Sequence, residues 1–499
     1  MINLLICGVN EDFFSSKDVK SVLNSNKVDN CYMLVHKKKE LDNYNGLGKC
    51  YLREEVAKGH LKYEADQSLS VIDDKILKYM EPFFVEILTQ QRRFEEYHEF
   101  QISQSLNDHY EIMIGNLKFW FETLQKNEIT HVFFTSVPHE GYDSIIYHLS
   151  KYLNLKVGLV YNATIPRRYY YLEDYLEEDK LLEKRFVELK NEYKEVPIDR
   201  IVFEDQIEQI YSKWASLEPE KMRPYYAKGN PLNKRYHTRF GVTNIFEAWY
   251  MILGEHYKKY NYKMSLRFLI NEIGNIYQYI EAIPNTIRRY RLGEPVRRRT
   301  KKLNTFYQKL AVNPDLKQKY VYFPLHYQPE ASSNPLGGRE LTDQRLAIGI
   351  LAASLPEGYY VYVKSHPEQL APFRSQDYYS EIAKIKNVKL VSMDTDTYDL
   401  MKNAIAVSSL TGTACWEAQF YGIPAILFGY SQKNIAPLSY HVRTVDECKS
   451  AIAKIINSPF KDVKKEMKLL TKAIYDTSFG VDEQDEGLQN GVKILIGIK

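Results

Sequence analysis

Short runs of β-branched and aromatic residues alternate with segments of helical periodicity over residues 319–456. The strand-like runs are 320–325, 359–364, 388–391, 405–409 and 425–429, and the helical segments are 342–356, a stretch ending near 385, 397–403, 413–421 and 445–457. Apolar strands that alternate with helices are typical of a parallel sheet with helices on both faces. This pattern predicts a doubly wound α/β domain.

The N-terminal third shows a looser version of the same pattern. We expect strands at 2–9, 31–36, 131–136 and 156–161, a helix at 142–153 and a long helical stretch over 70–126. The chain thus divides into an N-terminal Rossmann-like domain (1–165), a helical, Tyr- and charge-rich insertion or linker (166–310), a C-terminal Rossmann-like domain (311–480) and a tail that packs back on a domain (481–499). Open parallel sheets bind ligands beyond the carboxyl ends of their strands. We therefore expect a site in a cleft between two facing domains.

Composition narrows the class of protein. The chain of 499 residues is 44% hydrophobic and 26% charged, and its 67 basic and 64 acidic residues leave a net charge of +3. This near balance excludes a general nucleic-acid-binding surface. Five scattered cysteines without a CxxC pair indicate a reducing compartment and no structural zinc site. With no signal peptide and no apolar run of membrane-spanning length, we expect a cytoplasmic protein, with peripheral membrane contact left open.

The segment 408–429 carries the clearest binding motif. A strand ends at Ser409, and Thr411, Gly412 and Thr413 form the turn into the next helix. Backbone N–H groups at a helix N-terminus bind phosphate oxygens. Glu417 lies one turn further along the same helix face, where a carboxylate can hold a ribose. The alternative is an ordinary capped turn followed by a surface glutamate.

A second motif, 360–369, ends a strand at Lys364 and continues with His366 and Pro367. The proline keeps the histidine extended at the strand tip. An imidazole beside a lysine suits the departure of a phosphate group, by hydrogen-bond donation and charge neutralisation. The alternative is a loop histidine that only caps.

Two loops at other strand ends complete the candidate set. The first loop, 322–338, has His326, Gln328 and Glu330 at alternate positions, which share one face if the segment is extended. The alternative is a surface loop without a function in binding. In the second loop, 135–149, we expect Glu140 to be the base that deprotonates an acceptor hydroxyl. Asp143 and His139 are further candidates for this role. The alternative for this loop is helix capping, which favours acidic residues in a first turn.

Two further segments are weaker candidates. The sequence DTDT at 394–397 resembles a metal-binding DxD motif, but it precedes a helix, so a cap at Asp396 or Thr397 is the simpler interpretation. The basic run 288–302 has no aromatic platform and is expected to be a solvated linker or, second, a contact with an anionic lipid or polymer. No Walker A loop, GxGxxG fingerprint, HExxH or GxSxG motif occurs, and no metal or cofactor is expected.

Together, the three C-terminal motifs resemble those of the bacterial capsule polysaccharide biosynthesis family, which includes Kdo (3-deoxy-manno-octulosonate) transferases. The resemblance covers about residues 319–430, in the sequences YFPLHYQPEASSNPLGG, VKSHPE and SSLTGTACWEAQFYGIPAILFG, and departs from the family's usual residues at Ser365 and Cys415. It implies a GT-B glycosyltransferase fold of two Rossmann-like domains. It also implies that His366 and Thr411–Thr413 contact a donor phosphate and that Glu417 holds the ribose.

The resemblance leads to a functional expectation with two alternatives. We expect an inverting, metal-independent glycosyltransferase that moves a sugar, foremost an acidic one from a CMP donor, onto a surface glycan or glycolipid, with contact to the membrane or a polysaccharide assembly complex left open. The alternatives are a CDP-alditol phosphotransferase of the teichoic-acid type and a non-catalytic nucleotide-sugar-binding scaffold. The expected donor-binding set is Lys364, His366, Pro367, Ser409, Thr411, Gly412, Thr413, Glu417, Gln328 and Glu330.

Overall fold

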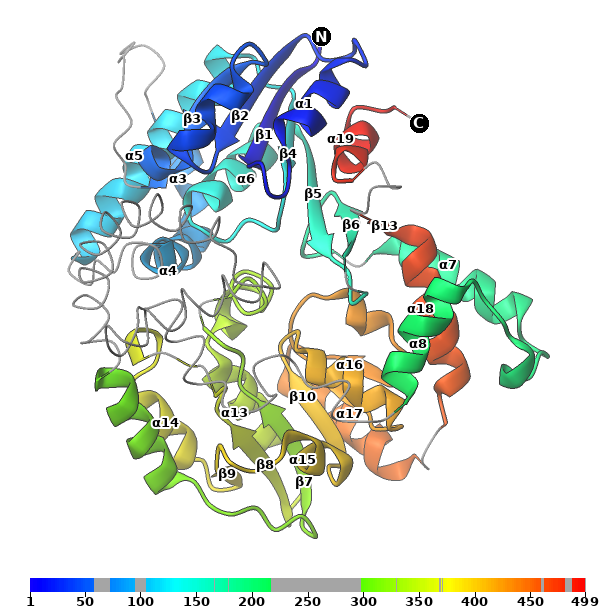
Figure 1. The fold of residues 1–499 in the computed structure, drawn as a ribbon. Helices are drawn as coiled ribbons and strands as arrows, with labels where there is room; N and C mark the ends of the chain where they lie inside the picture. The colour runs from blue at the N-terminus through cyan, green and yellow to red at the C-terminus, as the bar shows by residue number, and fades with distance from the viewer. Residues whose placement is uncertain are drawn as a thin grey trace, which may run out of the picture.

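The computed structural model describes residues 1–57, 72–94, 105–165, 167–177, 179–216, 298–328, 330–367, 369, 371–458, 462–480 and 487–498. Two sheets form two domains, one above the other in Figure 1. Most of the predicted insertion 166–310 and the first part of the basic run 288–302 lie outside the described residues. Among the described helices, none combines the length and apolar character of a membrane span.

The first sheet contains seven strands in the order β13-β6-β5-β4-β1-β2-β3. The strands are β1 (Asn3–Val9), β2 (Asn30–Val35), β3 (Lys49–Leu52), β4 (His131–Phe134), β5 (Lys156–Asn162), β6 (Arg168–Leu172) and β13 (Phe479–Gly480). β1 to β5 pair in parallel, whereas β6 and β13 pair antiparallel at one edge. The parallel part has the order 3-2-1-4-5 of a Rossmann-type sheet.

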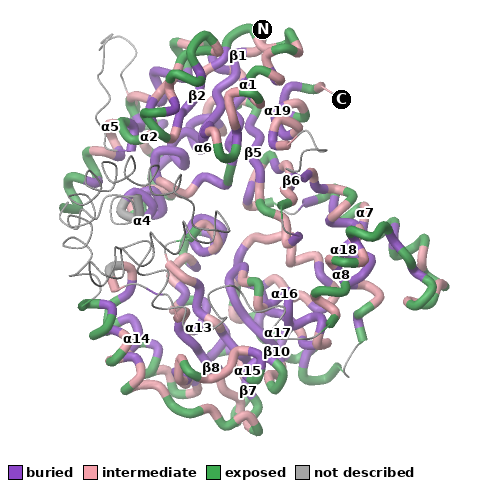
Figure 2. The backbone as a smooth tube through the Cα atoms, viewed as in Figure 1, coloured by how far each residue is buried: buried purple, intermediate pink, exposed green. Residues whose placement is uncertain are grey.

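Helices cover both faces of this sheet, as the alternation of side chains along β1 shows. Leu5 and Cys7 belong to a core with α5 (Leu106–Lys126) and α6 (Tyr142–Tyr152), while Leu4 and Ile6 belong to a core with α1 (Ser16–Leu23) and α19 (Gln489–Leu495). Successive strand residues point to opposite faces, so a continuous apolar run buries both sides. Figure 2 shows the strands of this sheet largely buried, and exposed residues on α1 and α5. Further helices of this half are α2 (Arg53–Ala57), α3 (Asp74–Met80) and α4 (Phe84–Phe94).

The second sheet is entirely parallel and has the order β12-β11-β10-β7-β8-β9. Its strands are β7 (Lys319–Pro324), β8 (Tyr359–Lys364), β9 (Val388–Leu390), β10 (Ala406–Ser409), β11 (Ala425–Leu427) and β12 (Ser439–His441). Its helices are α13 (Gln344–Ser354), α14 (Gln376–Ala383), α15 (Thr397–Lys402), α16 (Thr413–Phe420) and α17 (Val445–Asn457). Counted along the chain, the six strands have the Rossmann order 3-2-1-4-5-6. The predicted fold class, two Rossmann-like domains, is confirmed.

The structure corrects the predicted limits of both domains. β6, which was predicted to lie in the helical insertion, extends the first sheet, because its tyrosines pair with β5. α18 (Lys464–Thr477) and β13 were assigned to the second domain, yet α18 packs on α7 (Lys180–Glu192) and α8 (Asp205–Ala215), and β13 joins β6. Figure 1 shows red α18 beside green α7 and α8. The chain therefore returns to the first domain near residue 464.

Two other segments also bear on the predicted organisation. Within the described residues of the expected helical stretch 70–126, the structure has the three α-helices α3, α4 and α5, and Pro82 lies in the 3₁₀ turn between the first two. A proline has no N–H to donate and disfavours helix at the residue before it, so a break there is expected. At the other end of the chain, α19 lies against β4, β5 and α1.

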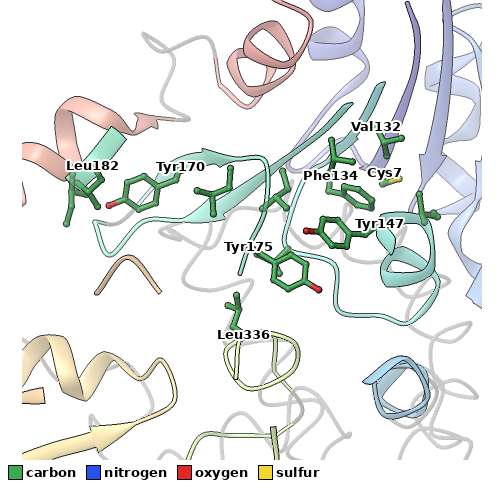
Figure 3. Close-up of a cluster of buried hydrophobic side chains, with 14 of the residues drawn as sticks. Cys7, Val132, Phe134, Tyr147, Tyr170, Tyr175, Leu182 and Leu336 are labelled. Carbon is green, nitrogen blue, oxygen red and sulfur yellow. The ribbon is translucent and has the colours of Figure 1, made fainter. Parts of the chain in front are cut away.

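Side chains from both domains share one apolar cluster. Leu336, from the loop after β7, lies beside Tyr175 in Figure 3, and Phe420 of α16 contacts Tyr211 and Trp214 of α8. Burial of apolar surface from both halves favours a fixed relation between them. The two domains are thus joined by a core as well as by the chain.

Candidate functional site

The central strands of the second sheet, β7 and β10, are neighbours although three helices and two strands separate them in sequence. The chain winds away from this pair in opposite directions, which makes it the topological switch point of the sheet. Ligands of open α/β sheets bind in the crevice outside the strand ends at this point. His326 follows the end of β7, and Ser409 ends β10.

Hydrogen bonds hold His326 across this switch point. Its Nε2 accepts the backbone N–H of Thr411 at 3.2 Å and lies 2.9 Å from Ser409 Oγ, while its Nδ1 lies 3.2 Å from Ser332 Oγ. Because Nε2 accepts from the backbone, the ring proton belongs on Nδ1 and the Ser409 hydroxyl donates to Nε2. Burial, followed by the charges of Lys433 and Arg374, lowers the pKa of His326 to about 3. The ring is therefore neutral and organises the turn.

The predicted phosphate turn is partly occupied by this network. The N–H of Thr411 goes to His326, the N–H of Gly412 donates to Ser409 Oγ at 2.7 Å, and the Thr411 hydroxyl donates to Ser332 O. Gly412 is the N-cap of α16 and supplies no capping side chain. Thr413, the first residue of the helix, is exposed. The first turn of α16 begins at this residue, and the first N–H groups of a helix lack partners further back in the helix.

Glu417 lies on α16 but is buried, with 7% of its surface exposed. Burial raises the pKa of its carboxyl to about 7, against a hydrogen bond from Tyr398 and the charge of Lys433, which both lower it. The alternative of a surface glutamate is excluded by this burial. To bind a ribose, the Glu417 carboxylate would have to replace a hydrogen bond within the protein, such as the one from Tyr398, with one from the sugar.

Three cationic side chains converge around His326 and His366. Lys364, at the end of β8, donates to Thr395 O and to Thr397 Oγ1, and Lys433 donates to Thr411 O at 2.7 Å. Arg374, which precedes α14, donates through Nη2 to His326 O. Burial lowers the pKa of Lys364 and of Lys433 to about 8. Within the described part of the chain, none of the three forms an ion pair with a carboxylate at salt-bridge distance.

His366 lies half-buried among these cations, with its ring 5.6 Å from that of Tyr327. Burial, followed by the charges of Arg374 and Lys364, lowers its pKa to about 3. A neutral imidazole keeps one N–H and can donate a hydrogen bond to an anion through it. Pro367 follows it in a turn, half-buried.

A cavity of about 420 Å³ opens between the two domains beside this cluster. Gln328, Arg374 and Tyr378 lie in its wall on the second domain, and Gln90 and His139 on the first. The wall also includes Thr89, Glu330, Ser333, Asn334, Thr342, Arg345, Ala371, Phe373 and Ser375. His366, Thr411–Thr413 and Glu417 do not line this cavity. The predicted residues therefore fall in two adjacent places, the cavity and the strand-end turns.

Gln90 of α4 connects the two walls. Its Nε2 donates to Asn334 Oδ1 at 3.0 Å, and its Oε1 accepts from the N–H of Gly141 and the hydroxyl of Ser144. The loop after β4 is thereby tied to the loop after β7. This buried link fixes the spacing across the cavity.

The three base candidates occupy different positions. Asp143 caps the turn, because it accepts hydrogen bonds from the N–H groups of His139, Glu140 and Ser144 at 2.7–2.8 Å. Burial raises the pKa of its carboxyl to about 7. Glu140 was expected to point into the cleft; instead both its oxygens bind Arg53, and one also accepts from Tyr142. His139 lines the cavity, and its Nδ1 contacts Val137 O. A carbonyl only accepts, so Nδ1 carries the proton and Nε2 the lone pair.

The remaining predicted residues have clear partners. Gln328 accepts at its backbone O from Gln369 Nε2 at 3.0 Å and donates through Nε2 to Thr342 O, while Glu330 accepts from Ser332 Oγ. Asp396 accepts two backbone N–H groups as the N-cap of α15. The capping interpretation of DTDT is confirmed for this residue.

Arg374, Tyr378 and Lys433 were not predicted as site residues. None belongs to a strand-end motif, since Lys433 follows β11 by several residues and the other two lie around the start of α14. The only sequence signal was an arginine near a tyrosine in a loop after a candidate strand, which is common. Their place in the site depends on how the loops fold over the strand ends.

No protein-family model matches the sequence, and no curated protein matches it. Among solved structures, the chain is similar to the β-Kdo 2,7-transferase KpsC of Thermosulfurimonas dismutans, at 11% identity and a TM-score of 0.32, over 79% of this chain and 90% of that one. It is also similar to the UDP-GlcNAc 2-epimerase of Neisseria meningitidis, at 12% identity, a TM-score of 0.24 and coverage of 100% and 99%. A glycosyltransferase of Rickettsia africae matches at 10% identity, a TM-score of 0.25 and coverage of 99% and 98%. At such scores the likeness is distant, and the fold assignment rests on the strand order of the two sheets.

Proposed function

We propose that the protein is a glycosyltransferase that takes its sugar from a nucleotide donor bound at the strand ends of the second domain. The observation that supports this most is the group of cations Lys364, Arg374 and Lys433 around two neutral histidines. Burying a charge without a counter-ion is costly, so such a group is retained where an anion binds. A nucleotide phosphate supplies that anion.

In the proposed reaction, His366 and Lys364 stabilise the negative charge that develops on the departing phosphate. Donors that are already in place act without reorganisation, which is why they lower the barrier strongly. The N-terminal turn of α16 supplies further N–H groups to the phosphate. We assign the ribose to the α16 region around Glu417, and the transferred sugar to the cavity between the domains.

We propose His139 as the base that accepts the proton of the acceptor hydroxyl. It is the member of its segment that lines the cavity, and its tautomer places the lone pair on Nε2. Glu140 becomes a positioning residue, because Arg53 and Tyr142 bind both its oxygens. A general base must come within about 3 Å of the proton that it removes.

The donor that we propose is a CMP-linked acidic sugar, and the acceptor is a bacterial surface glycan or glycolipid. The buried positive charge supports an acidic donor, and the motif resemblance to capsule polysaccharide enzymes supports the acceptor class. No metal ion is required in this scheme, because the cationic side chains of the protein neutralise the negative charge of the phosphate. Contact with a membrane or with an assembly complex stays part of the proposal, as does a cytoplasmic location.

A binding and product experiment tests this function. Isothermal titration with CMP, CDP, UDP and GDP should show one preferred nucleotide, with CMP foremost. Incubation with the matching sugar donor and a glycan acceptor should release the nucleotide, and phosphorus NMR should show no new phosphodiester in the glycan. A phosphodiester in the product would instead identify an alditol phosphotransferase, and nucleotide binding without turnover would identify a scaffold.

A further inference from the structure

Arg374 and Tyr378 carry hydrogen-bond donors that have no partner among the described residues. Only 4% of Arg374 and 9% of Tyr378 is exposed, and both lie in the wall of the cavity between the domains. Nη2 of Arg374 binds His326 O, but within the described part of the chain Nε and Nη1 have no hydrogen-bond partner, and neither does the Tyr378 hydroxyl. A buried donor without a partner costs about 1–3 kcal/mol and more when charged.

Among the residues that the structure describes, no carboxylate pairs with this guanidinium. Arg374 lies over the Tyr378 ring, 5.1 Å from its centroid, and its charge contributes to the low pKa of both His326 and His366. Arg345 lies over the same ring at 5.2 Å, yet its own guanidinium is paired with Asp343 and Glu381. The two arginines on this ring thus differ in their pairing, because only Arg345 has carboxylate partners among the described residues.

Thr342 adds a third unpartnered donor in the same wall. Its Oγ1 is buried and forms no hydrogen bond with a described residue, while its backbone O accepts from Gln328 Nε2 at 3.1 Å. Arginine, tyrosine and threonine donors in one cavity wall match the chemistry of an oxyanion, which accepts several hydrogen bonds at once. A neutral sugar hydroxyl would leave the guanidinium charge uncompensated.

We infer that Arg374, Tyr378 and Thr342 form an oxyanion subsite in the interdomain cavity, separate from the phosphate turn at α16. Its ligand is an acidic group of the substrate, either a carboxylate on the transferred sugar or a phosphate of the donor. This inference deepens the proposed function and rests on it for the identity of the substrate. The site lies on the second domain and faces Gln90 and His139 across the cavity.

Titration calorimetry at fixed ionic strength tests the subsite with three probes: CMP, cytidine and free Kdo, an acidic sugar without a phosphate. Arg374→Gln should weaken binding of the anionic probe by about 10- to 100-fold, the usual effect of losing a charged hydrogen bond. Weaker CMP binding with unchanged cytidine binding would assign the subsite to phosphate. Weaker Kdo binding with unchanged CMP binding would assign it to the sugar carboxylate.

Arg374 also donates a hydrogen bond to the carbonyl of His326, so Arg374→Gln can weaken binding by disturbing the fold. Two other variants distinguish this effect from the loss of a ligand contact. Tyr378→Phe removes one hydroxyl and should weaken the same probe by about 2- to 10-fold without loss of thermal stability. Arg185→Gln is the control, because its guanidinium is paired with Asp476 and Glu188 on the first domain and does not line the cavity, and it should change affinity for the probes less than twofold.

The outcomes separate the subsite from the proposed function. If Arg374→Gln and Tyr378→Phe fold and bind CMP and Kdo as the wild type does, the subsite is wrong even though a nucleotide binds. If the wild type binds Kdo in an Arg374-dependent way but binds none of the nucleotides, the subsite stands and the proposed nucleotide-dependent function fails. If the wild type binds neither CMP nor Kdo, the subsite is overturned.

Discussion

Nε2 of His326, just beyond β7, accepts a hydrogen bond from the hydroxyl of Ser409, at the end of β10, over a distance of 2.9 Å. The same Ser409 oxygen accepts the N–H of Gly412, so one histidine and one serine fix the turn into α16. The link crosses the switch point of the sheet, where Rossmann-type folds bind their ligands. A mutation that breaks it should alter both the stability of the turn and the affinity for a nucleotide.

Gly412→Ala tests this link directly. A Cβ at position 412 would lie 2.4 Å from Ser409 Oγ, so the serine must move and lose its bond to the histidine. We expect a loss of about 1–3 kcal/mol in the free energy of unfolding, together with weaker nucleotide binding, measured by urea denaturation and calorimetry.

Gly349→Ala is the control for Gly412→Ala. Gly349 lies within α13, and a Cβ there would meet no atom within 4 Å. Alanine in a helix interior should therefore stabilise the protein by about 0.5–1 kcal/mol. Equal effects of the two substitutions would contradict the proposed role of the Gly412 contact.

The buried carboxyl of Glu417 should make stability depend on pH. Burial raises its pKa to about 7, whereas in the unfolded chain it is about 4.3. Between these values the unfolded state loses the proton first, so the wild type should lose stability as the pH rises. Glu417→Gln lacks this effect and should gain up to about 3 kcal/mol over the wild type between pH 4 and pH 8, measured by denaturation at each pH. A difference that is independent of pH would contradict the raised pKa.

His366→Ala should act mainly on the chemical step. The imidazole is neutral and lies beside Lys364 and Arg374, where it can donate to the departing phosphate. We expect kcat to fall by about 10²–10³-fold, with a smaller change in the KM for the donor. Glu417→Ala, in contrast, should raise the donor KM more than it lowers kcat. Wild-type kinetics in both folded variants would remove these residues from the donor site.

The variants His139→Gln and Glu140→Gln test which residue is the catalytic base and which only positions its neighbours. His139 lines the cavity, so its replacement should lower transfer by about 10²-fold while donor binding survives. Glu140→Gln breaks the pair with Arg53, two side chains that are each 13% exposed, so it should chiefly lower thermal stability. A fully active His139→Gln variant beside an inactive, folded Glu140→Gln variant would return the role of base to Glu140.

Activity should not depend on a divalent metal ion. Asp396 of the DTDT segment caps α15, and Lys364 binds the backbone of that segment. Transfer in excess EDTA should equal transfer with Mg²⁺ or Mn²⁺, and Asp396→Ala should cost about 1 kcal/mol of stability through the lost cap. Loss of activity in EDTA that Mn²⁺ restores, together with inactivity of Asp394→Asn, would overturn the prediction.

The periodicity of the sequence determined the fold class and the positions of most strands. β8 begins and ends at the predicted residues. Both ends of β7 and the C-terminal end of α16 differ from the prediction by one residue. These segments are predictable because a strand buried on both faces is apolar throughout and a helix between strands has its own period. Strand-end motifs likewise located His326, His366 and the turn at Gly412, since the chain places them beside a strand of known direction.

Only the tertiary structure decided what surrounds each of these side chains. Glu140 and Glu417 have the sequence pattern of functional carboxylates, but Arg53 binds the first and burial encloses the second. Arg374 joins the site although no motif includes it, because its loop returns to the carbonyl of His326. Local sequence fixes where a residue stands along its element, whereas partners, burial and charge depend on loops that meet only in the folded chain. For that reason the strand ends were predictable, and the place of Arg374 in the cavity wall was not.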